Sequence, residues 1–360
     1  MSDHRAGRIR LVAVIHSTFE VNMKKNAIAL GVLGLFSGLV SAQSSVTLYG
    51  VVDVALERVK GATSLTRVSS GQQQGSRLGF RGTEDLGGGL KAMFVLESGF
   101  NADVGTFGQG GRMFGRQSFL SLGGGWGAVR LGRQYTPMDD VVSIVGTKTY
   151  DVLSVVPIIG NGDYNRVDNA VTYVSPTVGN TVFQLQYSLG EERVSTNTSA
   201  DFAKQVSAHA LYANGPLTAG ISLMQVTDAD GVLAGKQGRD ALLLAGAYDF
   251  GSFKLSAYYD AEDKAAKKLK VYGLSAAFKS GETTVSVGAA QAKDVNGSAA
   301  AASDDARLYT LQANHNLSKR TAIYGHLTVV DNDTASALGF NSPVAGSNSN
   351  GIQFGLRHRF

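Results

Sequence analysis

The chain has 360 residues, with 33 Lys and Arg against 29 Asp and Glu, five prolines and no cysteine. The lack of cysteine excludes a fold stapled by disulfides. The basic balance does not indicate nucleic-acid binding, because five basic and two acidic side chains fall in residues 1–42. Subtracting them leaves 28 basic and 27 acidic side chains in residues 43–360.

The first 42 residues have the pattern of an export signal. Met23 is followed by Lys24 and Lys25, by an apolar run, and by small residues up to Ala42, which is typical of a secretory signal peptide. The apolar run is short for the ~20 residues of a membrane-spanning helix. We therefore predict an upstream extension from a misassigned start codon at 1–22, a signal peptide at 23–42 and the folded domain at 43–360.

From residue 43 onward, apolar and polar residues alternate with a period of two. Such a period predicts β-strands, because successive side chains of a strand point to opposite faces of the sheet. Near the start, Val46, Leu48 and Val52 share one face, and Tyr49 and Asp53 share the other. The last ten residues, GIQFGLRHRF, divide in the same way apart from His358: Ile352, Phe354, Leu356 and Phe360 against Gln353, Arg357 and Arg359.

Short and long connections follow one another between the alternating runs. Seven are short and turn-like, and eight are longer and polar, so fifteen connections join sixteen strands of about 8–15 residues. No helix is expected in residues 43–360. The long connections span residues 60–73, 101–111, 136–165, 190–203, 229–239, 261–268, 294–305 and 332–349.

This arrangement predicts an all-β fold, a 16-stranded antiparallel transmembrane β-barrel. Strands of ~9–11 residues cross a bilayer, and outer-membrane barrels have short turns at one end and long loops at the other. An even number of strands lets the last strand pair with the first, which removes exposed edges. The apolar parity should face lipid and the polar parity a wet lumen. A secreted β-sandwich or repeat adhesin is disfavoured, because no second layer is present to cover the polar faces.

The 30-residue connection 136–165 differs from the others in its content of Val and Ile. A loop of this length is usually functional or disordered. Its apolar side chains require burial, so we predict that it folds into the barrel as a constriction loop.

Several segments together resemble the general-diffusion porins of the Gram-negative outer membrane, across essentially all of residues 43–360. The resemblance implies a 16-stranded barrel, a homotrimer, a third long loop folded into the lumen, and a terminal Phe360 read by the barrel-assembly machinery. The segments are SSVTLYGVVD, SRLGFRGTEDLGGGLKAMFVLESGF, GRMFGRQSFLSL, GAVRLGRQY, RVDNAVTYVSP, NLSKRTAIYGHL and GLRHRF.

The resemblance also implies a basic cluster on the wall opposite the loop. Its matching positions are Arg77, Arg133 and Arg166, with Arg81 and Arg116 as neighbours; strand parity also turns Arg77 and Arg81 inward. Arginine rings select for anions. Where many family members have an acidic PEFGG-like segment, this chain reads PIIGNG, with Ile158 in place of the glutamate. The remaining candidates for counter-charges are Asp139, Asp140, Asp151 and Asp163. Because the arginines face few acidic residues, we predict that the channel has a weak to moderate preference for anions.

No enzyme is predicted from residues 43–360. The four histidines lie on different predicted strands, and no nucleophile elbow, phosphate loop or metal motif is found. We expect no cofactor, no metal and no nucleic-acid partner. The expected partners are a homotrimer, outer-membrane lipid and lipopolysaccharide, the barrel-assembly machinery, and small hydrophilic solutes and ions. Two alternatives stay open beside a general diffusion pore: a specific channel for phosphate or small organic anions, and a barrel that acts mainly as a surface adhesin.

Overall fold

The structure, a computed structural model, describes residues 45–145, 165–190, 204–227, 238–264, 267–295 and 303–360. These residues form eighteen strands in a continuous antiparallel sheet. In chain order the strands are β1 (Ser45–Lys60), β2 (Ser64–Ser70), β3 (Arg77–Gly87), β4 (Leu90–Asn101), β5 (Thr106–Phe107), β6 (Gln117–Gly124), β7 (Gly127–Tyr135), β8 (Arg166–Val174), β9 (Thr181–Ser188), β10 (Lys204–Asn214), β11 (Leu217–Thr227), β12 (Arg239–Asp249), β13 (Phe253–Lys264), β14 (Lys267–Ser280), β15 (Thr283–Lys293), β16 (Ala306–Asn316), β17 (Thr321–Asn332) and β18 (Ser349–Arg359).

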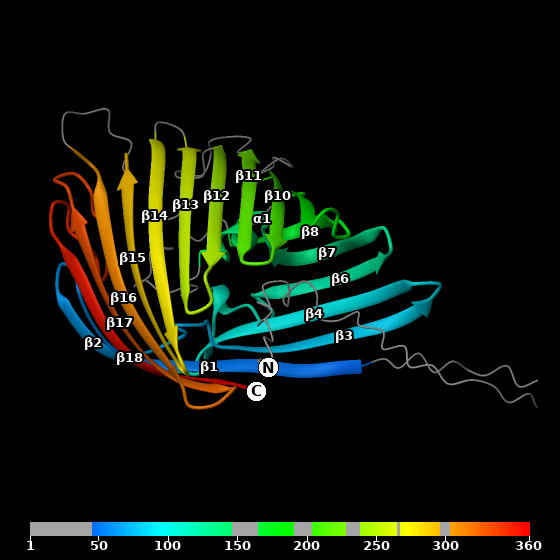
Figure 1. Ribbon diagram of the computed structural model, residues 1–360, viewed down its shortest axis with the longest axis horizontal. Coiled ribbons are helices and arrows are strands. Elements are labelled where there is room, and N and C mark those ends of the chain that lie inside the picture. Colours follow the sequence, from blue (N-terminus) through cyan, green and yellow to red (C-terminus); the bar gives the residue numbers. More distant parts are fainter. Residues whose placement is uncertain (1–44, 146–164, 191–203, 228–237, 265–266, 296–302) are drawn as a thin grey trace, which may run out of the picture. The chain divides into compact units, whose positions relative to one another are not determined.

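Sixteen of the eighteen strands build a closed barrel. The short strands β2 and β5 are the other two, and they fold back on β1 and β4 inside long connections. The barrel closes where β1 pairs with β18, from Val51 opposite Arg359 to Lys60 opposite Asn350. Figure 1 shows this seam, with blue β1 beside red β18. The predicted 16-stranded antiparallel barrel is confirmed.

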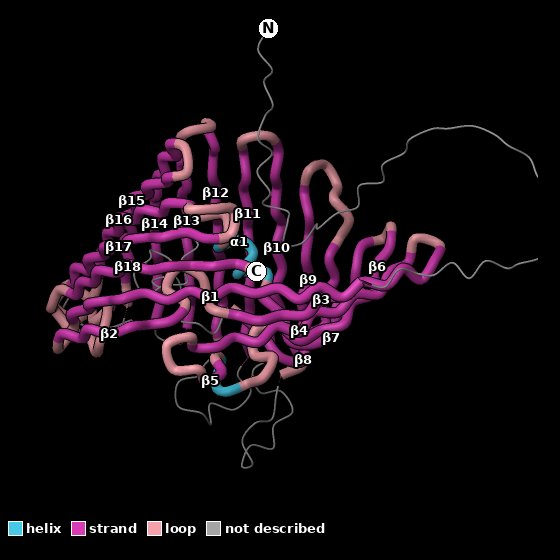
Figure 2. The backbone as a smooth tube through the Cα atoms, turned by 90° about the horizontal axis from the view of Figure 1, so that it is seen from below, coloured by secondary structure: helices cyan, strands magenta, loops and turns pink. Residues whose placement is uncertain are grey.

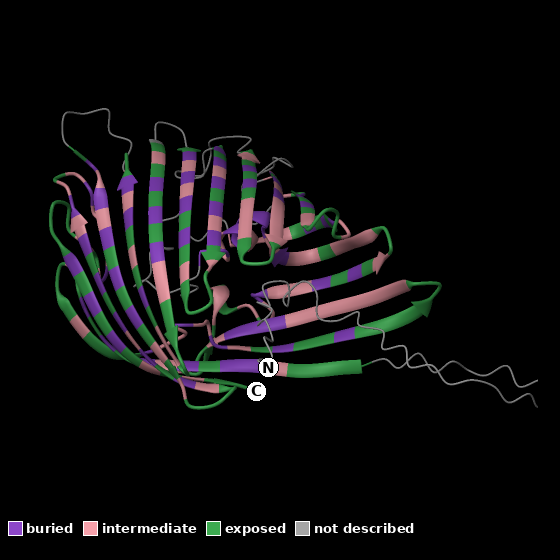
Figure 3. Ribbon diagram, in the orientation of Figure 1, coloured by how far each residue is buried: buried purple, intermediate pink, exposed green. Residues whose placement is uncertain are grey.

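The barrel wall has apolar side chains outside and polar side chains inside. On β1, Leu48 is 55% exposed, whereas the carboxylate residue Asp53 is fully buried. On β18, Phe354 is 62% exposed and Gln353 is fully buried. Figure 3 shows the resulting alternation of buried with more exposed residues along strands such as β12 and β14. A soluble protein has the opposite arrangement, with apolar side chains inside. Apolar side chains outside are expected of a barrel with a lipid-facing exterior and a polar lumen, and the predicted assignment of the two faces is confirmed.

The seam between the two end strands is held by backbone and side-chain hydrogen bonds. The amide of Phe360 donates to the carbonyl of Gly50, and the amide of Gly50 donates to the carbonyl of Phe360, both at 3.1 Å. On the lumen side, Nε2 of Gln353 donates to Oε2 of Glu57 at 2.8 Å and to Oε1 of Gln72 at 2.9 Å. The ladder between β1 and β18 therefore reaches the last residue, and the buried amide nitrogen of Gln353 is hydrogen-bonded.

A short helix, α1 (Pro137–Val142), begins the connection 136–165. The prediction of no helix was therefore wrong. The side chain of Thr136 caps the helix by accepting from the amide of Asp139 at 3.3 Å, Pro137 occupies the first turn, and two aspartates follow there. These are standard signals of a helix start, and the Val and Ile content of the segment obscured them.

The start of this connection lies on the lumen side of the wall. Helix α1 contacts β10, β11 and β12, and Figure 2 shows it in cyan beside β10 and β11. Met138, Val141 and Ile144 are at most 1% exposed. A Cβ on Gly220, which has the lumen parity of β11, would come within 2.7 Å of Cδ1 of Ile144. Residues 136–145 thus fold inward as predicted, whereas 146–164 lie outside the described residues.

The predicted extension 1–22 and signal peptide 23–42 also lie outside the described residues. Within the described ranges, no helix has the length and apolar character needed to cross a membrane.

Candidate pore constriction

Arginines from neighbouring strands gather on the lumen face between β3 and β8. One group shares the carboxylate of Asp168 on β8. Nη1 of Arg133 lies 2.7 Å from its Oδ1, and Nη1 of Arg112 lies 2.7 Å from its Oδ2. Nε of Arg133 also donates to the carbonyl of Gly115 at 2.7 Å. One carboxylate therefore fixes two guanidinium groups, and Arg133 stays 18% exposed.

A second group meets at the hydroxyl of Tyr135, at the end of β7. This oxygen accepts from Nη2 of Arg116 and from Nη2 of Arg166, each at 2.6 Å. The guanidinium of Arg166 also lies over the Tyr135 ring, 4.3 Å from its centroid. Nε of Arg116 donates to Oε1 of Glu97 at 2.7 Å, and the two side chains are only 5% and 4% exposed. Charge-assisted hydrogen bonds of this kind fix orientation strongly.

The backbone is irregular on both strands beside Arg133. Leu131 on the same strand is 54% exposed to the lipid side, so strict alternation would send Arg133 outward as well. The ladder between β7 and β8 is irregular here: Gly132 lies opposite Ala170 but Gln134 lies opposite Val167, so the extra residue is on β8, where Asn169 has φ +51°. Gly132 has φ +128°, and a Cβ there would clash with the carbonyl oxygen of Ser118. Only glycine fits at position 132, and this unusual backbone immediately precedes Arg133, whose guanidinium contacts Asp168.

Arg77 and Arg81 are less alike than their shared parity suggests. Arg77 interacts electrostatically with Glu97, which joins it to the group around Tyr135. Arg81 lies over the ring of Tyr49, 5.3 Å from the centroid, and is exposed. The structure thus brings four of the five proposed basic residues together, and Arg81 is linked to them through Tyr49, whose hydroxyl donates to Oε2 of Glu97 at 2.9 Å. We call the joined set, with Arg112 added, the arginine wall: Arg77, Arg112, Arg116, Arg133 and Arg166.

The two proposed acidic residues that the structure describes, Asp139 and Asp140, belong to α1 and not to the arginine wall. Oδ2 of Asp140 on α1 is 3.8 Å from Nε2 of His209 on β10, and Asp140 also interacts electrostatically with Arg130. Asp139 is buried in the first turn of α1. Asp151 and Asp163 lie outside the described residues, and the pore roles of all four remain predictions.

Sequence reasoning missed the carboxylates that contact the arginine wall. Glu97 lies on β4 and Asp168 on β8, so both come from strands rather than from the loop. Asp168 follows Arg166 by two residues, and this i, i+2 spacing on one strand face was the available signal. The pairing of Arg116 with Glu97 joins residues on adjacent strands β4 and β6, and no local pattern reveals it. Arg112 lies in a loop, where parity says nothing.

A polar cavity of about 270 Å³ adjoins the wall. Its lining includes Ser70, Ser76, Asn165, Arg116 and Arg166. Nε of Arg166 is buried and has no hydrogen-bond partner. Within the described residues, no group of three or more His, Cys, Asp or Glu side chains is placed to hold a metal ion.

The arrangement therefore has the properties of a charged water-filled passage through an outer-membrane barrel. Comparison with known proteins agrees. The model of the Gram-negative porin family matches residues 29–335. Outer membrane porin protein 32 of Delftia acidovorans is 36% identical, over 94% of this chain and all of the relative.

Solved structures extend the likeness to the fold. The anion-selective porin from Comamonas acidovorans superposes with a TM-score of 0.76 at 32% identity, covering 88% of this chain and all of that one. OmpT of Vibrio cholerae, in its trimer form, superposes with a TM-score of 0.66 at 16% identity, over 88% and 99% of the two chains. At that identity only the barrel fold is shared.

The chain belongs to the Gram-negative porin family. It is an outer-membrane diffusion channel for ions and small hydrophilic solutes and not an enzyme. The resemblance noted in the sequence is thereby confirmed.

Proposed function

We propose that this channel is weakly to moderately anion-selective and that the arginine wall produces the selectivity. The observation that carries the proposal is an imbalance of charge: five guanidinium groups face two carboxylates, Glu97 and Asp168. Arginine keeps its charge beside like charges, and arginine-lined constrictions favour anions. The relative of known structure with 32% identity is described as anion-selective, which supports the same property here.

Secondary contributions to the field are also proposed. Arg81 adds positive potential from the same strand as Arg77. The four aspartates act as counter-charges that limit the anion preference to a moderate value: Asp139, Asp140, Asp151 and Asp163.

The test is the reversal potential of the purified channel in a planar bilayer under a KCl gradient. Arg133→Gln with Arg166→Gln should lower the anion-to-cation permeability ratio. A unit charge at 4 Å in water is worth about 1 kcal/mol, so each loss should change the ratio by about fivefold. Arg307→Gln is the matched control, because Arg307 has the outward parity of β16 and pairs with Asp331 and Asp333. An unchanged ratio in the double variant contradicts the proposal.

A second candidate is a channel specific for phosphate or small organic anions. The 270 Å³ cavity beside Arg116 and Arg166 favours it, because the unpartnered Nε of Arg166 is a donor for an anion there. Conductance that saturates with phosphate concentration would support this function, and linear conductance would favour the general pore.

Export and assembly are proposed along with the pore. Residues 1–22 are not part of the translated protein, 23–42 are removed as a signal peptide, and 43–360 form the barrel. The mature chain forms a homotrimer, contacts outer-membrane lipid and lipopolysaccharide, and presents Phe360 to the barrel-assembly machinery. The trimeric form of OmpT, a protein of the same fold, supports the oligomer, and native mass spectrometry of the purified protein tests it.

A further inference from the structure

The connection between β2 and β3 turns toward the lumen. Residues 71–76 of this connection read GQQQGS and have no regular secondary structure. A Cβ on Gly71 would lie 3.0 Å from Cα of Gly75, so the two ends of the segment approach each other closely. Gly71 has φ +74°, a conformation that glycine adopts without steric cost. We call residues 71–76 the glutamine loop.

Asp53 on β1 holds the backbone of the glutamine loop. Its Oδ2 accepts from the amides of Gln73 at 3.2 Å and Gln74 at 2.8 Å. Its carbonyl accepts from the amide of Gly71 at 2.8 Å, and its amide donates to Oγ of Ser76 at 3.0 Å. Asp53 is fully buried, and hydrogen bonds to a charged acceptor are strong. The middle and both ends of the loop are therefore fixed to the lumen face of β1.

The glutamine side chains extend this attachment beyond β1. Oε1 of Gln72 accepts from Nε2 of Gln353 on β18 at 2.9 Å. Nε2 of Gln73 donates to Oδ1 of Asn314 on β16 at 2.9 Å. Both glutamines are 8% exposed, so their side chains lie against the wall. The loop thus crosses the seam of the barrel on its lumen side.

The glutamine loop also lies beside the arginine wall. A Cβ on Gly75 would come within 2.9 Å of Nη1 of Arg116. Gly71, Gly75 and Ser76 line the 270 Å³ cavity together with Arg116 and Arg166. The loop therefore lies at the level of the passage where the arginines gather.

The glutamine loop occupies a part of the lumen face that neither the arginine wall nor α1 covers. The arginine wall lies between β3 and β8, and α1 contacts β10, β11 and β12. The glutamine loop instead contacts β1, β16 and β18. Its sequence has no ionisable side chain, so it takes up space in the lumen without adding charge.

We propose that the glutamine loop is a second, uncharged constriction that limits the size of the neutral polar solutes admitted by the channel. Gln74 is the least buried of its three glutamines, and its Oε1 accepts from Nε of Arg359 at 3.3 Å. Its side chain is therefore the part of the loop that borders the passage. The inference goes beyond the anion selectivity proposed above and does not depend on it.

The first experiment uses the absence of cysteine from the chain. Gln74→Cys places a single thiol on the glutamine loop, and a bulky neutral methanethiosulfonate reagent is added to open channels in a planar bilayer. Conductance should fall in each channel and recover when the reagent is removed by dithiothreitol. Labelling is verified by mass spectrometry.

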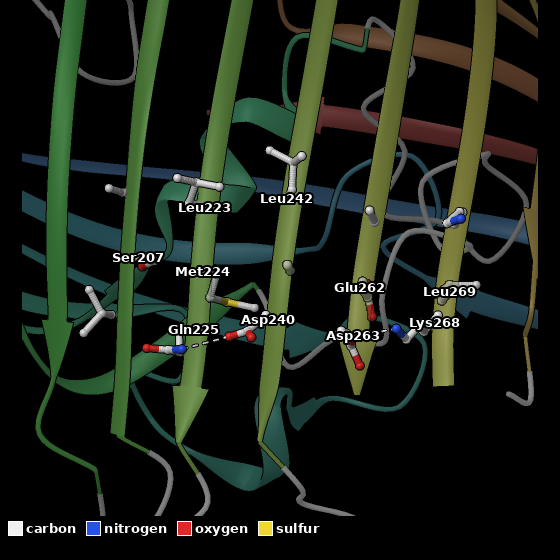
Figure 4. A pocket seen from close by; sticks show the side chains of 15 residues that line it. Ser207, Leu223, Met224, Gln225, Asp240, Leu242, Glu262, Asp263, Lys268 and Leu269 are labelled. Carbon is white, nitrogen blue, oxygen red and sulfur yellow. Dashed lines mark hydrogen bonds and ion pairs between the residues drawn. The ribbon is translucent and has the colours of Figure 1, made fainter. Parts of the chain in front are cut away.

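Gln225→Cys is the matched control for this labelling. Gln225 lies in the hollow over β10–β14 on the outward parity of β11, where its Nε2 donates to Oδ1 of Asp240 at 3.0 Å (Figure 4). The reagent should leave the conductance of the control unchanged. A Gln74→Cys channel that is not labelled, or is labelled without loss of conductance, overturns the proposal.

The second experiment shortens the loop side chains without changing charge, in the variant Gln72→Ala/Gln73→Ala/Gln74→Ala. Loss of the hydrogen bonds of Gln72 and Gln73 should lower the equilibrium constant for holding the loop on the wall by about thirtyfold. In liposome swelling with neutral sugars of increasing size, the larger sugars should enter faster relative to the smallest one. Gln225→Ala is the control and should behave as the wild type.

The reversal potential separates this proposal from the proposed anion selectivity. It should be the same in the triple variant and the wild type, because no charged group is removed. Unchanged sugar ratios overturn the proposal. A changed reversal potential with unchanged sugar ratios also overturns it, and would assign the loop to positioning the arginines. Either result leaves the anion selectivity of the wild type to be judged by its own test.

Discussion

The two sides of the lumen differ in the side chains that line them: one side is charged and hydrogen-bonded, and the other has an apolar patch. The arginine wall holds charged side chains in place with hydrogen bonds of 2.6–2.7 Å to Glu97, Asp168 and Tyr135. The wall formed by β10–β12 instead has an apolar patch, where Leu243 and Met224 are at most 3% exposed on the lumen parity. The patch breaks the rule of a polar lumen because α1 packs in that region. One side supplies charge to the passage, and the other packs α1 against apolar side chains.

Loss of a buried carboxylate from the arginine wall should have the largest effect on stability. Glu97→Gln leaves the charge of Arg116 without its carboxylate in a nearly closed site. Removing one partner of a buried ion pair costs about 3–5 kcal/mol. The midpoint of guanidinium unfolding in detergent should fall accordingly.

Two further variants show whether the burial of the Glu97–Arg116 pair causes this loss of stability. Asp331→Asn removes an acid from the exposed Arg307, whose side chain is 41% exposed, and should cost less than about 1 kcal/mol. Glu97→Gln/Arg116→Met should restore much of the lost stability, because no uncompensated charge remains. Similar midpoints for Glu97→Gln and Asp331→Asn would show that the wall is not rigidly paired.

The apolar side can be disturbed through the close approach at Gly220. Gly220→Val places side-chain atoms where Ile144 and Val141 now lie. Such overpacking costs about 1–3 kcal/mol and should displace α1, so single-channel conductance should change while ion selectivity is kept. Gly246→Val is the matched control, because a Cβ there would have only one neighbour, at 3.9 Å. A conductance equal to that of the control would mean that α1 does not set the width of the passage.

Asp168→Asn is expected to have the smallest effect of these variants, and the property that changes is ion selectivity. This change removes the negative charge shared by Arg112 and Arg133, so anion preference should rise, opposite to the effect of Arg133→Gln. Partly exposed pairs are worth less than about 1 kcal/mol, which limits the change in permeability ratio to about fivefold. The same reversal-potential measurement checks it. A fall in anion preference would indicate that Asp168 matters mainly by positioning its two arginines.

The sequence was sufficient to predict the barrel because the signal repeats along every strand. Ile352 and Phe354 against Gln353 show which face each side chain takes, and sixteen such runs give the architecture. The irregular backbone beside Gly132 could not be predicted this way, because parity alone places Arg133 on the lipid face. Only family resemblance identified that residue.

The counter-charges were harder to predict because they depend on contacts between strands. Glu97 on β4 contacts Arg116 next to the neighbouring strand β6, and Asp168 on β8 contacts Arg112, which lies in a loop. The partners are far apart in the sequence, so no local sequence pattern predicts either pair. The helix α1 did have one, in the sequence of Thr136 and Pro137. It was outweighed by the Val and Ile content of the segment, which correctly predicted burial but not local structure.

The reversal potential of the wild-type channel under a KCl gradient, measured at two ionic strengths, tests the role of the arginine wall most directly. The screening length falls from about 10 Å at 0.1 M salt to about 3 Å at 1 M. We predict a potential on the anion side at 0.1 M that shrinks strongly at 1 M, because fixed arginine charge produces it. A potential on the cation side, or one of equal size at both salt concentrations, would contradict the account.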